Sequence, residues 1–158
     1  MSISEGAIAE TVELFKALAD ETRLRILKLL LSADEGVCVC ELVEALDLPQ
    51  YRVSRHLNIL KRAGLLEAER SGAWVYYSPA RDAPPLIAGL FSIIRDRLVL
   101  RTSEEDLEHL RERLALRVRG ACVVGSRSER GKECPLEGSV RSYSGSPLWS
   151  GQATPGGR

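Results

Sequence analysis

The sequence predicts a mainly α-helical domain with one small β-hairpin. Apolar residues recur at helical spacing through most of residues 1–119, helix-ending signals separate these stretches, and two β-prone runs flank a glycine-containing turn. A chain of 158 residues is long enough to bury the hydrophobic core of one ordinary domain.

Periodicity and a capping residue predict the first two helices. Asp20 is suited to cap a second helix over residues 21–31, because its carboxylate can accept hydrogen bonds from the free backbone N–H groups in the first turn of that helix. The first helix covers residues 7–19 and places four apolar residues along one face: Ile8, Val12, Phe15 and Leu18.

Two further helices are predicted after a loop. The third runs from about Cys38 or Val39 to Leu46, where the approach to a proline ends it. The fourth begins at Pro49, which suits a first helical position, continues to Ala63 and stops at Gly64, a residue suited to a left-handed cap. Its inner apolar stripe leaves Arg52, Ser54, Arg55 and Asn58 facing outward.

A β-hairpin and two more helices complete the predicted domain. The runs Leu65–Arg70 and Trp74–Ser78 flank the turn, so the order is helix, turn, helix and then a hairpin with a basic rim. This order outlines a winged helix-turn-helix. A helix follows Pro84-Pro85 to about Leu100, and Ser103 with Asp106 can form a capping box that opens the last one.

The terminal apolar stripes predict a homodimer. A domain this small cannot bury the stripes of both the first helix and the helix after Pro85 within itself, so we expect each to pair with its mate across a two-fold axis. The alternative is that they complete the core of the monomer. Residues 120–158 contain eight Gly, seven Ser and three Pro, and this composition predicts a disordered tail.

The charge is divided along the chain although the formal net charge is zero. Residues 5–48 carry ten acids and four bases, whereas residues 49–81 carry six bases and two acids. This division indicates one acidic flank and one basic surface that faces phosphate, with an ordinary solvated face as the alternative.

The lack of a recognisable signal peptide or membrane-spanning run predicts a cytoplasmic protein. The N-terminus is acidic and lacks the features of a signal peptide, and no run of about 18 apolar residues could span a membrane. In the cytosol thiols stay reduced, so the four cysteines are better explained as metal-binding or sensing groups than as disulfides.

Cys38 and Cys40 are the candidate ligand site. Thiolates select soft ions, and a helix N-terminus is expected to lower the pKa of a nearby thiol. In a regular helix, residues i and i+2 point roughly 200° apart, so both sulfurs could reach one ion only if the first turn unwinds. We hypothesise that the strain of unwinding this first turn is the switch that displaces the recognition helix.

Four motifs resemble the arsenical-resistance repressor family (ArsR/SmtB). They are Leu18-Ala-Asp-Glu-Thr-Arg-Leu-Arg-Ile-Leu27, Cys38-Val-Cys-Glu-Leu42, Val53-Ser-Arg-His-Leu57 and Trp74-Val-Tyr-Tyr77, and the likeness covers roughly residues 8–80. The resemblance implies a homodimeric winged-helix repressor that leaves its operator when a metal or metalloid binds. It also implies that the Cys-Val-Cys pair is the inducer site for As(III) or Sb(III), with Cd(II) or Pb(II) as the alternative.

Two departures from the family pattern affect the site. Arsenic-responsive members often carry a third cysteine where this chain has Val43, so Cys122, Cys134 or an external thiol would have to supply a third sulfur. The turn into the recognition helix reads Pro49-Gln50-Tyr51-Arg52 in place of a serine-capped turn. The family's second site holds zinc with His and carboxylates, and the only histidines here, His56 and His109, do not predict it.

The recognition helix supplies the candidate contacts to double-stranded operator DNA. In helix-turn-helix docking the N-terminal residues of this helix reach base edges, while Arg70 at the hairpin turn would meet phosphate or the minor groove. His56 could instead hold the interface between helices. The candidate helix residues are Gln50, Arg52, Ser54, Arg55 and His56.

An enzyme is not predicted, because the sequence has no nucleophile elbow, phosphate-binding glycine loop or HExxH-type motif. The contrasting hypothesis is a thiol redox switch on the same fold. A Cys38–Cys40 disulfide would be strained at this spacing, so oxidation would have to involve a tail cysteine.

Overall fold

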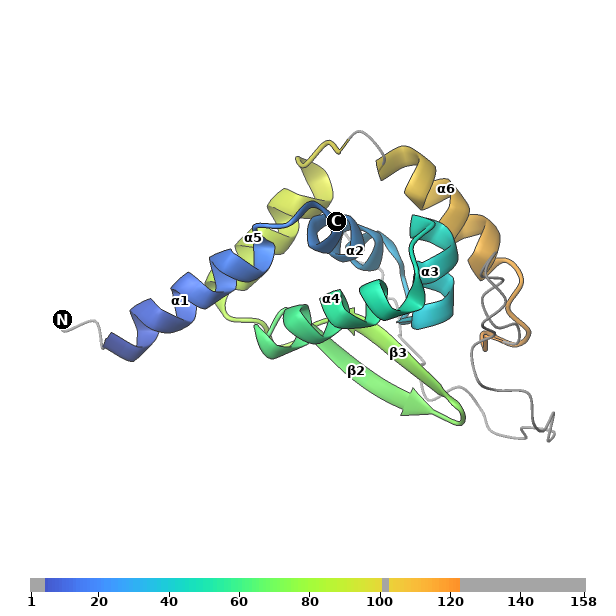
Figure 1. The fold of residues 1–158 in the computed structure, drawn as a ribbon, viewed down its shortest axis with the longest axis horizontal. Helices are drawn as coiled ribbons and strands as arrows, with labels where there is room; N and C mark the ends of the chain where they lie inside the picture. The colour runs from blue at the N-terminus through green and yellow to red at the C-terminus, as the bar shows by residue number, and fades with distance from the viewer. Residues whose placement is uncertain (1–4, 101–102, 123–158) are drawn as a thin grey trace, which may run out of the picture.

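A computed structural model of the chain describes residues 5–100 and 103–122 (Figure 1). Within these residues it contains six helices and a three-stranded antiparallel sheet, in the order of a winged helix-turn-helix. The predicted fold is therefore confirmed. None of the described helices is both long and apolar enough to cross a lipid bilayer.

The N-terminal helices are α1 (Glu5–Leu18) and α2 (Glu21–Ser32). Asp20 is extended and its carboxylate accepts from the backbone N–H of Arg23 at 3.0 Å, which confirms the predicted N-cap. The core lies around α2. Its fully buried side chains include Ile26, Leu27, Leu29 and Leu30 from α2, Leu42 from α3, and Leu57 and Leu60 from α4.

The helix-turn-helix unit consists of α3 (Val39–Leu46) and α4 (Gln50–Arg62). Asp47, in a left-handed conformation, ends α3, and Pro49 caps α4 from an extended conformation. The chain leaves α4 through Gly64, whose φ of 75° fits the predicted left-handed position.

The wing is the hairpin of β2 (Leu66–Ser71) and β3 (Trp74–Pro79), which turns at Gly72 with a φ of 61°. A short strand that the sequence did not indicate, β1 (Val37–Cys38), pairs with the other edge of β3. In its register Val37 faces Tyr77 and Cys38 faces Tyr76. Two residues carry no periodicity, so only the structure reveals that Cys38 belongs to the sheet.

The last two helices are α5 (Pro85–Asp96) and α6 (Ser103–Leu114). The expectation that α5 reaches about Leu100 is wrong, because Arg97 caps the helix and the chain turns away. Lys28 of α2 donates to the carbonyl oxygens of Ile94, Arg95 and Leu98. A side chain of another helix therefore supplies hydrogen bonds to carbonyl groups at the C-terminal end of α5.

The first helix and α5 leave large apolar side chains uncovered. In Figure 1, α1 extends from the body of the molecule, and α3 and α6 lie on the opposite side. Three of the four residues predicted to form the stripe of α1 are about half exposed, and Leu18 alone among them is buried. The exposed side chains are Ile8, Val12 and Phe15 in α1, and Leu86 and Ile93 in α5.

A buried ion pair holds α6 against α2. Both carboxylate oxygens of Asp106 accept from Arg25, at 2.8 Å from Nε and 2.7 Å from Nη2. The capping box of Ser103 with Asp106 stays a prediction, because the side chain of Ser103 lies outside the described residues. The side chain of Asp106 is only 5% exposed. Such a planar, two-bond pairing fixes the distance and the orientation between the two helices.

We predict that Arg25→Met lowers the free energy of unfolding by about 3 kcal/mol or more, because it leaves the Asp106 carboxylate buried without its partner. Urea unfolding followed by circular dichroism measures this. The matched control is Arg111→Met, since Arg111 pairs with Glu108 on the exposed face of α6 and should contribute less than about 1 kcal/mol. Equal losses from both variants would contradict the prediction.

Candidate metal centre and nucleic-acid interface

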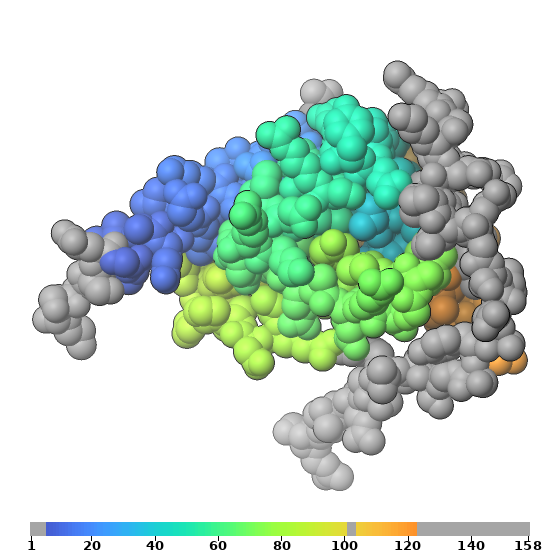
Figure 2. Space-filling model, turned by 60° about the horizontal axis from the view of Figure 1, so that its bottom comes forward, coloured from blue at the N-terminus to red at the C-terminus, as the bar shows by residue number. Residues whose placement is uncertain are grey.

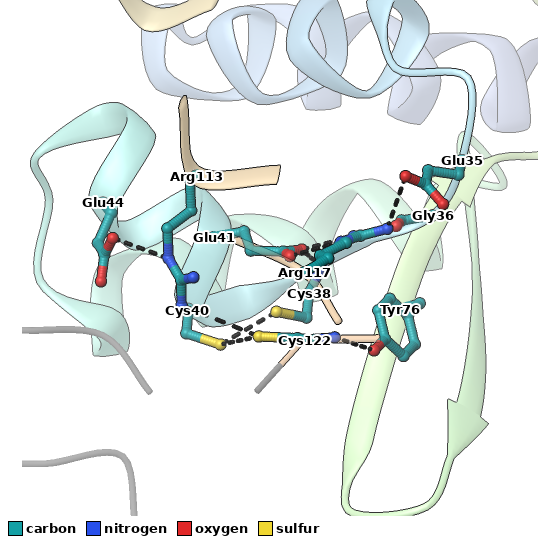
Figure 3. A network of polar contacts seen from close by, with 10 residues as sticks. All are labelled: Glu35, Gly36, Cys38, Cys40, Glu41, Glu44, Tyr76, Arg113, Arg117 and Cys122. Carbon is teal, nitrogen blue, oxygen red and sulfur yellow. Dashed lines mark hydrogen bonds and ion pairs between the residues drawn. The ribbon is translucent and has the colours of Figure 1, made fainter. Parts of the chain in front are cut away.

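Three cysteines from three parts of the chain meet in one buried cluster (Figure 3). Cys38 comes from β1, Cys40 from the first turn of α3 and Cys122 from the segment after α6. The Sγ atoms of Cys38 and Cys40 are 3.0 Å apart, and those of Cys40 and Cys122 are 3.6 Å apart. All three lie within 4.8 Å of one another, and Trp74 and Tyr76 of the wing pack against them.

The backbone at Cys38 explains how two thiols separated by one residue converge. Cys38 has φ −84° and ψ 164°, so it is the extended cap of α3 and not part of the helix. The 200° separation applies only when both residues are helical. The hypothesis that the first turn must unwind before both sulfurs reach one ion is therefore wrong, because they already converge on an intact helix.

Cys122 is held in the fold although the sequence analysis assigned it to the tail. After α6 the chain forms a tight bridge between Val118 and Ala121, which turns Cys122 back toward α3. The backbone N–H of Cys122 donates to the hydroxyl of Tyr76 at 3.0 Å. Residues 120–122 thus pack with the domain, whereas Cys134 and the rest of the predicted tail lie outside the described residues.

The completely buried carboxylate of Glu41 joins the cluster to the segment that follows α6. Glu41 accepts from the backbone N–H of Cys38 at 2.8 Å, and it accepts from Nε and Nη2 of Arg117, each at 2.7 Å. Arg117 also donates to the carbonyl of Gly36 and lies over the ring of Tyr76 at 5.4 Å. This one guanidinium therefore contacts the loop before β1, helix α3 and the wing.

A second buried arginine lies beside the thiols. Nη2 of Arg113 is 3.9 Å from Sγ of Cys122, and its Nε is 2.8 Å from a carboxylate oxygen of Glu44. The Arg113 side chain is 3% exposed and that of Glu44 is 30% exposed. The positive charge next to the cluster is thus already paired with a carboxylate.

Hydrogen bonding and burial raise the pKa values of Cys38 and Cys40. The expectation that the helix N-terminus lowers a thiol pKa is wrong here: hydrogen bonding to Cys122 and Cys40, together with burial, raises the pKa of Cys38. Hydrogen bonding to Cys122 and burial raise the pKa of Cys40 to about 12. The nearby charge of Glu41 acts in the same direction on both thiols.

The cluster fits a single soft ion. Thiolates bound about 2.3 Å from one ion at tetrahedral angles lie about 3.8 Å apart. Cys40 and Cys122 are near this spacing, and Cys38 needs to move only slightly from Cys40. Three sulfur donors with no oxygen or imidazole donor among them favour a thiophilic ion over a hard cation.

The predicted DNA contacts lie on α4 and on the wing. In the space-filling view these two elements adjoin each other on one face (Figure 2). Arg52, Arg55 and Arg70 are exposed, whereas Gln50 and Ser54 are half-buried. Arg70 donates to the carbonyl of Gly72 at 3.3 Å, which places its guanidinium at the hairpin turn.

His56 differs from the other candidates. Its side chain is 13% exposed, and its Nδ1 lies 3.5 Å from Nη1 of Arg23 and 3.8 Å from a carboxylate oxygen of Asp20. Burial lowers its pKa. The structure thus places His56 between α4 and the start of α2, in the interface that the sequence left open as its alternative position.

Sequence reasoning missed four residues of the centre: Glu41, Tyr76, Arg113 and Arg117. A signal was present, because Glu41 and Glu44 are three apart and Arg113 and Arg117 four apart, so each pair can lie on one side of a helical turn. Nothing local indicated that the two pairs face each other, because Glu41 and Arg117 are 76 residues apart in the chain.

Comparisons with known proteins identify the family of this chain. The family described as "Bacterial regulatory protein, arsR family" matches residues 20–68. An uncharacterised HTH-type transcriptional regulator of Methanocaldococcus jannaschii is 49% identical over 69 residues, which are 43% of this chain and 75% of that protein. The arsenical resistance operon repressor of Escherichia coli is 49% identical over 73 residues, which are 46% of this chain and 62% of that protein.

A solved structure shares the fold. It is the homodimeric winged helix-turn-helix DNA-binding domain of a possible ArsR-family transcriptional regulator from Mycobacterium bovis. It is 33% identical to this chain, and the match covers 60% of this chain and 83% of that one with a TM-score of 0.50.

These likenesses are to regulators and not to enzymes, and they include the helix-turn-helix unit that holds Cys38 and Cys40. The chain belongs to the arsR family of bacterial regulatory proteins, which are winged-helix, DNA-binding regulators of transcription.

Proposed function

We propose that the protein is a repressor that releases its operator when As(III) or Sb(III) binds to Cys38, Cys40 and Cys122. The observation that carries the proposal is the buried cluster of three thiols, which supplies three sulfur donors to one ion. Trivalent arsenic and antimony take three thiolates, and Cys122 provides the sulfur that Val43 does not. The likeness to the arsenical resistance operon repressor of Escherichia coli supports the same class of inducer.

Cd(II) and Pb(II) are the alternative inducers, because both are soft ions that bind thiolates. Cys134, which lies outside the described residues, would be a fourth thiol donor for these ions. The proposal places the protein in the cytoplasm, where its thiols stay reduced.

The site lies where it can act on both DNA-contacting elements. Cys40 is in α3, which turns at Asp47 into the recognition helix α4. Cys38 pairs with Tyr76 of the wing, and the hydroxyl of Tyr76 accepts from the backbone of Cys122. An ion that fixes the spacing of the three sulfurs, and so moves Cys38 away from Cys40, therefore acts on α3 and on β3 at once. Release requires that the ion bind the displaced arrangement more tightly than the DNA-bound one.

We infer a homodimer with a palindromic operator. The exposed apolar side chains of α1 and α5 are the surface that a second copy would cover, as the sequence analysis expected. The homodimeric relative from Mycobacterium bovis supports this arrangement. Two recognition helices related by a two-fold axis would read half-sites about one helical turn apart.

A thiol redox switch is the second candidate function. The 3.6 Å between the sulfurs of Cys40 and Cys122 favours it, because a disulfide between residues far apart in the chain avoids the strain expected for Cys38 with Cys40. The two thiols would give up two protons and two electrons to hydrogen peroxide, an S–S bond would form, and the O–O bond of the peroxide would break to give two waters.

Arsenite should release the wild-type protein from operator DNA, and Cys38→Ser, Cys40→Ser and Cys122→Ser should each raise the arsenite concentration for half-release at least about tenfold. A serine hydroxyl cannot replace a thiolate toward a soft ion. Fluorescence anisotropy of a labelled operator measures release, and each variant is first shown to bind the operator without arsenite.

Cys134→Ser is the comparison variant in this experiment and should behave as the wild type. If peroxide releases the protein and arsenite does not, the redox candidate replaces the metalloid one. If arsenite releases Cys122→Ser at the wild-type concentration, the assignment of Cys122 is wrong.

Arg55→Ala should weaken operator binding by about 1–3 kcal/mol and relax the preference for one base pair, because its exposed guanidinium is placed to read a base edge. Arg70→Ala should weaken binding to every sequence and lower the slope of log affinity against log salt by about 1. Arg111→Ala, on the exposed face of α6, serves as the control. An unchanged salt slope for Arg70→Ala would show that the wing turn does not meet phosphate.

Phe15→Glu should convert a dimer into monomers, because it places a carboxylate in the exposed apolar stripe of α1. Sedimentation equilibrium measures the mass. Glu13→Gln, on the same helix with an exposed side chain, is the control and should stay dimeric. A Phe15→Glu variant that remains dimeric would move the interface elsewhere.

A further inference from the structure

The cations beside the thiol cluster are already paired with carboxylates. Arg113 donates from Nη2 to Sγ of Cys122 at 3.9 Å, and its Nε is 2.8 Å from the Glu44 carboxylate. Arg117 is paired through two bonds with Glu41, and its Nη1 lies 3.1 Å from Glu35. Both guanidinium groups are nearly excluded from water, so neither charge is screened by solvent.

Bound ions differ in the charge that they would leave in this cluster. Arsenous acid, As(OH)₃, exchanges its three hydroxyls for three thiols: three As–O and three S–H bonds break, three As–S bonds form and three waters leave. The product is uncharged, as are the thiols that it replaces. A divalent ion that displaces the three thiol protons leaves a complex of charge −1. Such a charge is costly in a buried site whose described cations, Arg113 and Arg117, are already paired with carboxylates.

We propose that Glu44, through its ion pair with Arg113, makes the three-thiol cluster selective for ions that form an uncharged complex and disfavours divalent ions. Glu44 does not touch the bound ion. It acts by pairing with the guanidinium that would otherwise offset an anionic complex at Cys122. This inference rests on the proposed function and adds the residue that ranks the inducers.

The geometry sets the size of the effect. The Arg113 nitrogen is 3.9 Å from Sγ of Cys122, so a unit charge on the complex would interact strongly with a guanidinium released from its carboxylate. In a partly buried site such a pair changes affinity by about tenfold or more. An uncharged complex would be affected much less by the same guanidinium.

The test compares the affinities of As(III) and Cd(II) for the purified full-length protein. Ultraviolet thiolate-to-ion absorption follows binding, and a chromophoric chelator competes for Cd(II). We expect Glu44→Gln to raise the Cd(II) affinity about tenfold or more and to change the As(III) affinity less than about threefold. Glu108→Gln, on the exposed face of α6, should change neither affinity.

The double variant Glu44→Gln/Arg113→Gln removes both charges and keeps hydrogen-bonding side chains, so it should lose the Cd(II) gain. If Glu44→Gln does not fold, Arg113→Gln tests the same pair, because it leaves the Glu44 carboxylate without this cation and should lower the Cd(II) affinity more than the As(III) affinity. Equal shifts of both affinities in Glu44→Gln, or a Cd(II) gain that persists in the double variant, would overturn the role of Glu44 alone. A wild-type protein that binds no As(III) would overturn the proposed function together with it.

Discussion

The pair of Arg117 with Glu41 is the interaction on which the centre depends. Glu41 is fully buried and holds the backbone N–H of Cys38, so it fixes the start of α3. Arg117 brings the segment after α6 against that carboxylate, and five residues later the same segment delivers Cys122. Without this pair the carboxylate would be buried alone, and the segment that carries the third sulfur would lose its anchor on α3.

The sequence predicted the features that depend on local physics. The N-cap at Asp20, the left-handed end at Gly64 and the hairpin around Gly72 each follow from a few neighbouring residues, and all three occur as expected. The Cys38–Cys40 pair was found for the same reason, because two thiols one residue apart are visible without a fold. Local capping and turn chemistry act on the chain wherever it lies.

The features that were missed depend on contacts between distant segments. Strand β1 forms because the edge of β3 is available for pairing. Asp106 of α6 pairs with Arg25 of α2, which is 81 residues away in the chain. Cys122 was assigned to an unpacked tail because composition describes an average over a segment, whereas its burial depends on the two residues Tyr76 and Arg113. The lowered thiol pKa was expected from the helix end alone, and the neighbouring thiols reverse it.

The distance in sequence between Cys40 and Cys122 has a consequence for sensitivity. The two sulfurs are 82 residues apart in the chain and meet only while the segment after α6 is docked. The effective concentration of the Cys122 thiol at the other two thiols is therefore set by the fraction of molecules in which that segment is docked. A chain whose docked state is populated half of the time binds its ligand with half of the intrinsic affinity. The dose at which such a protein responds is thus adjustable by the packing of its last helix, without any change to the sulfurs themselves.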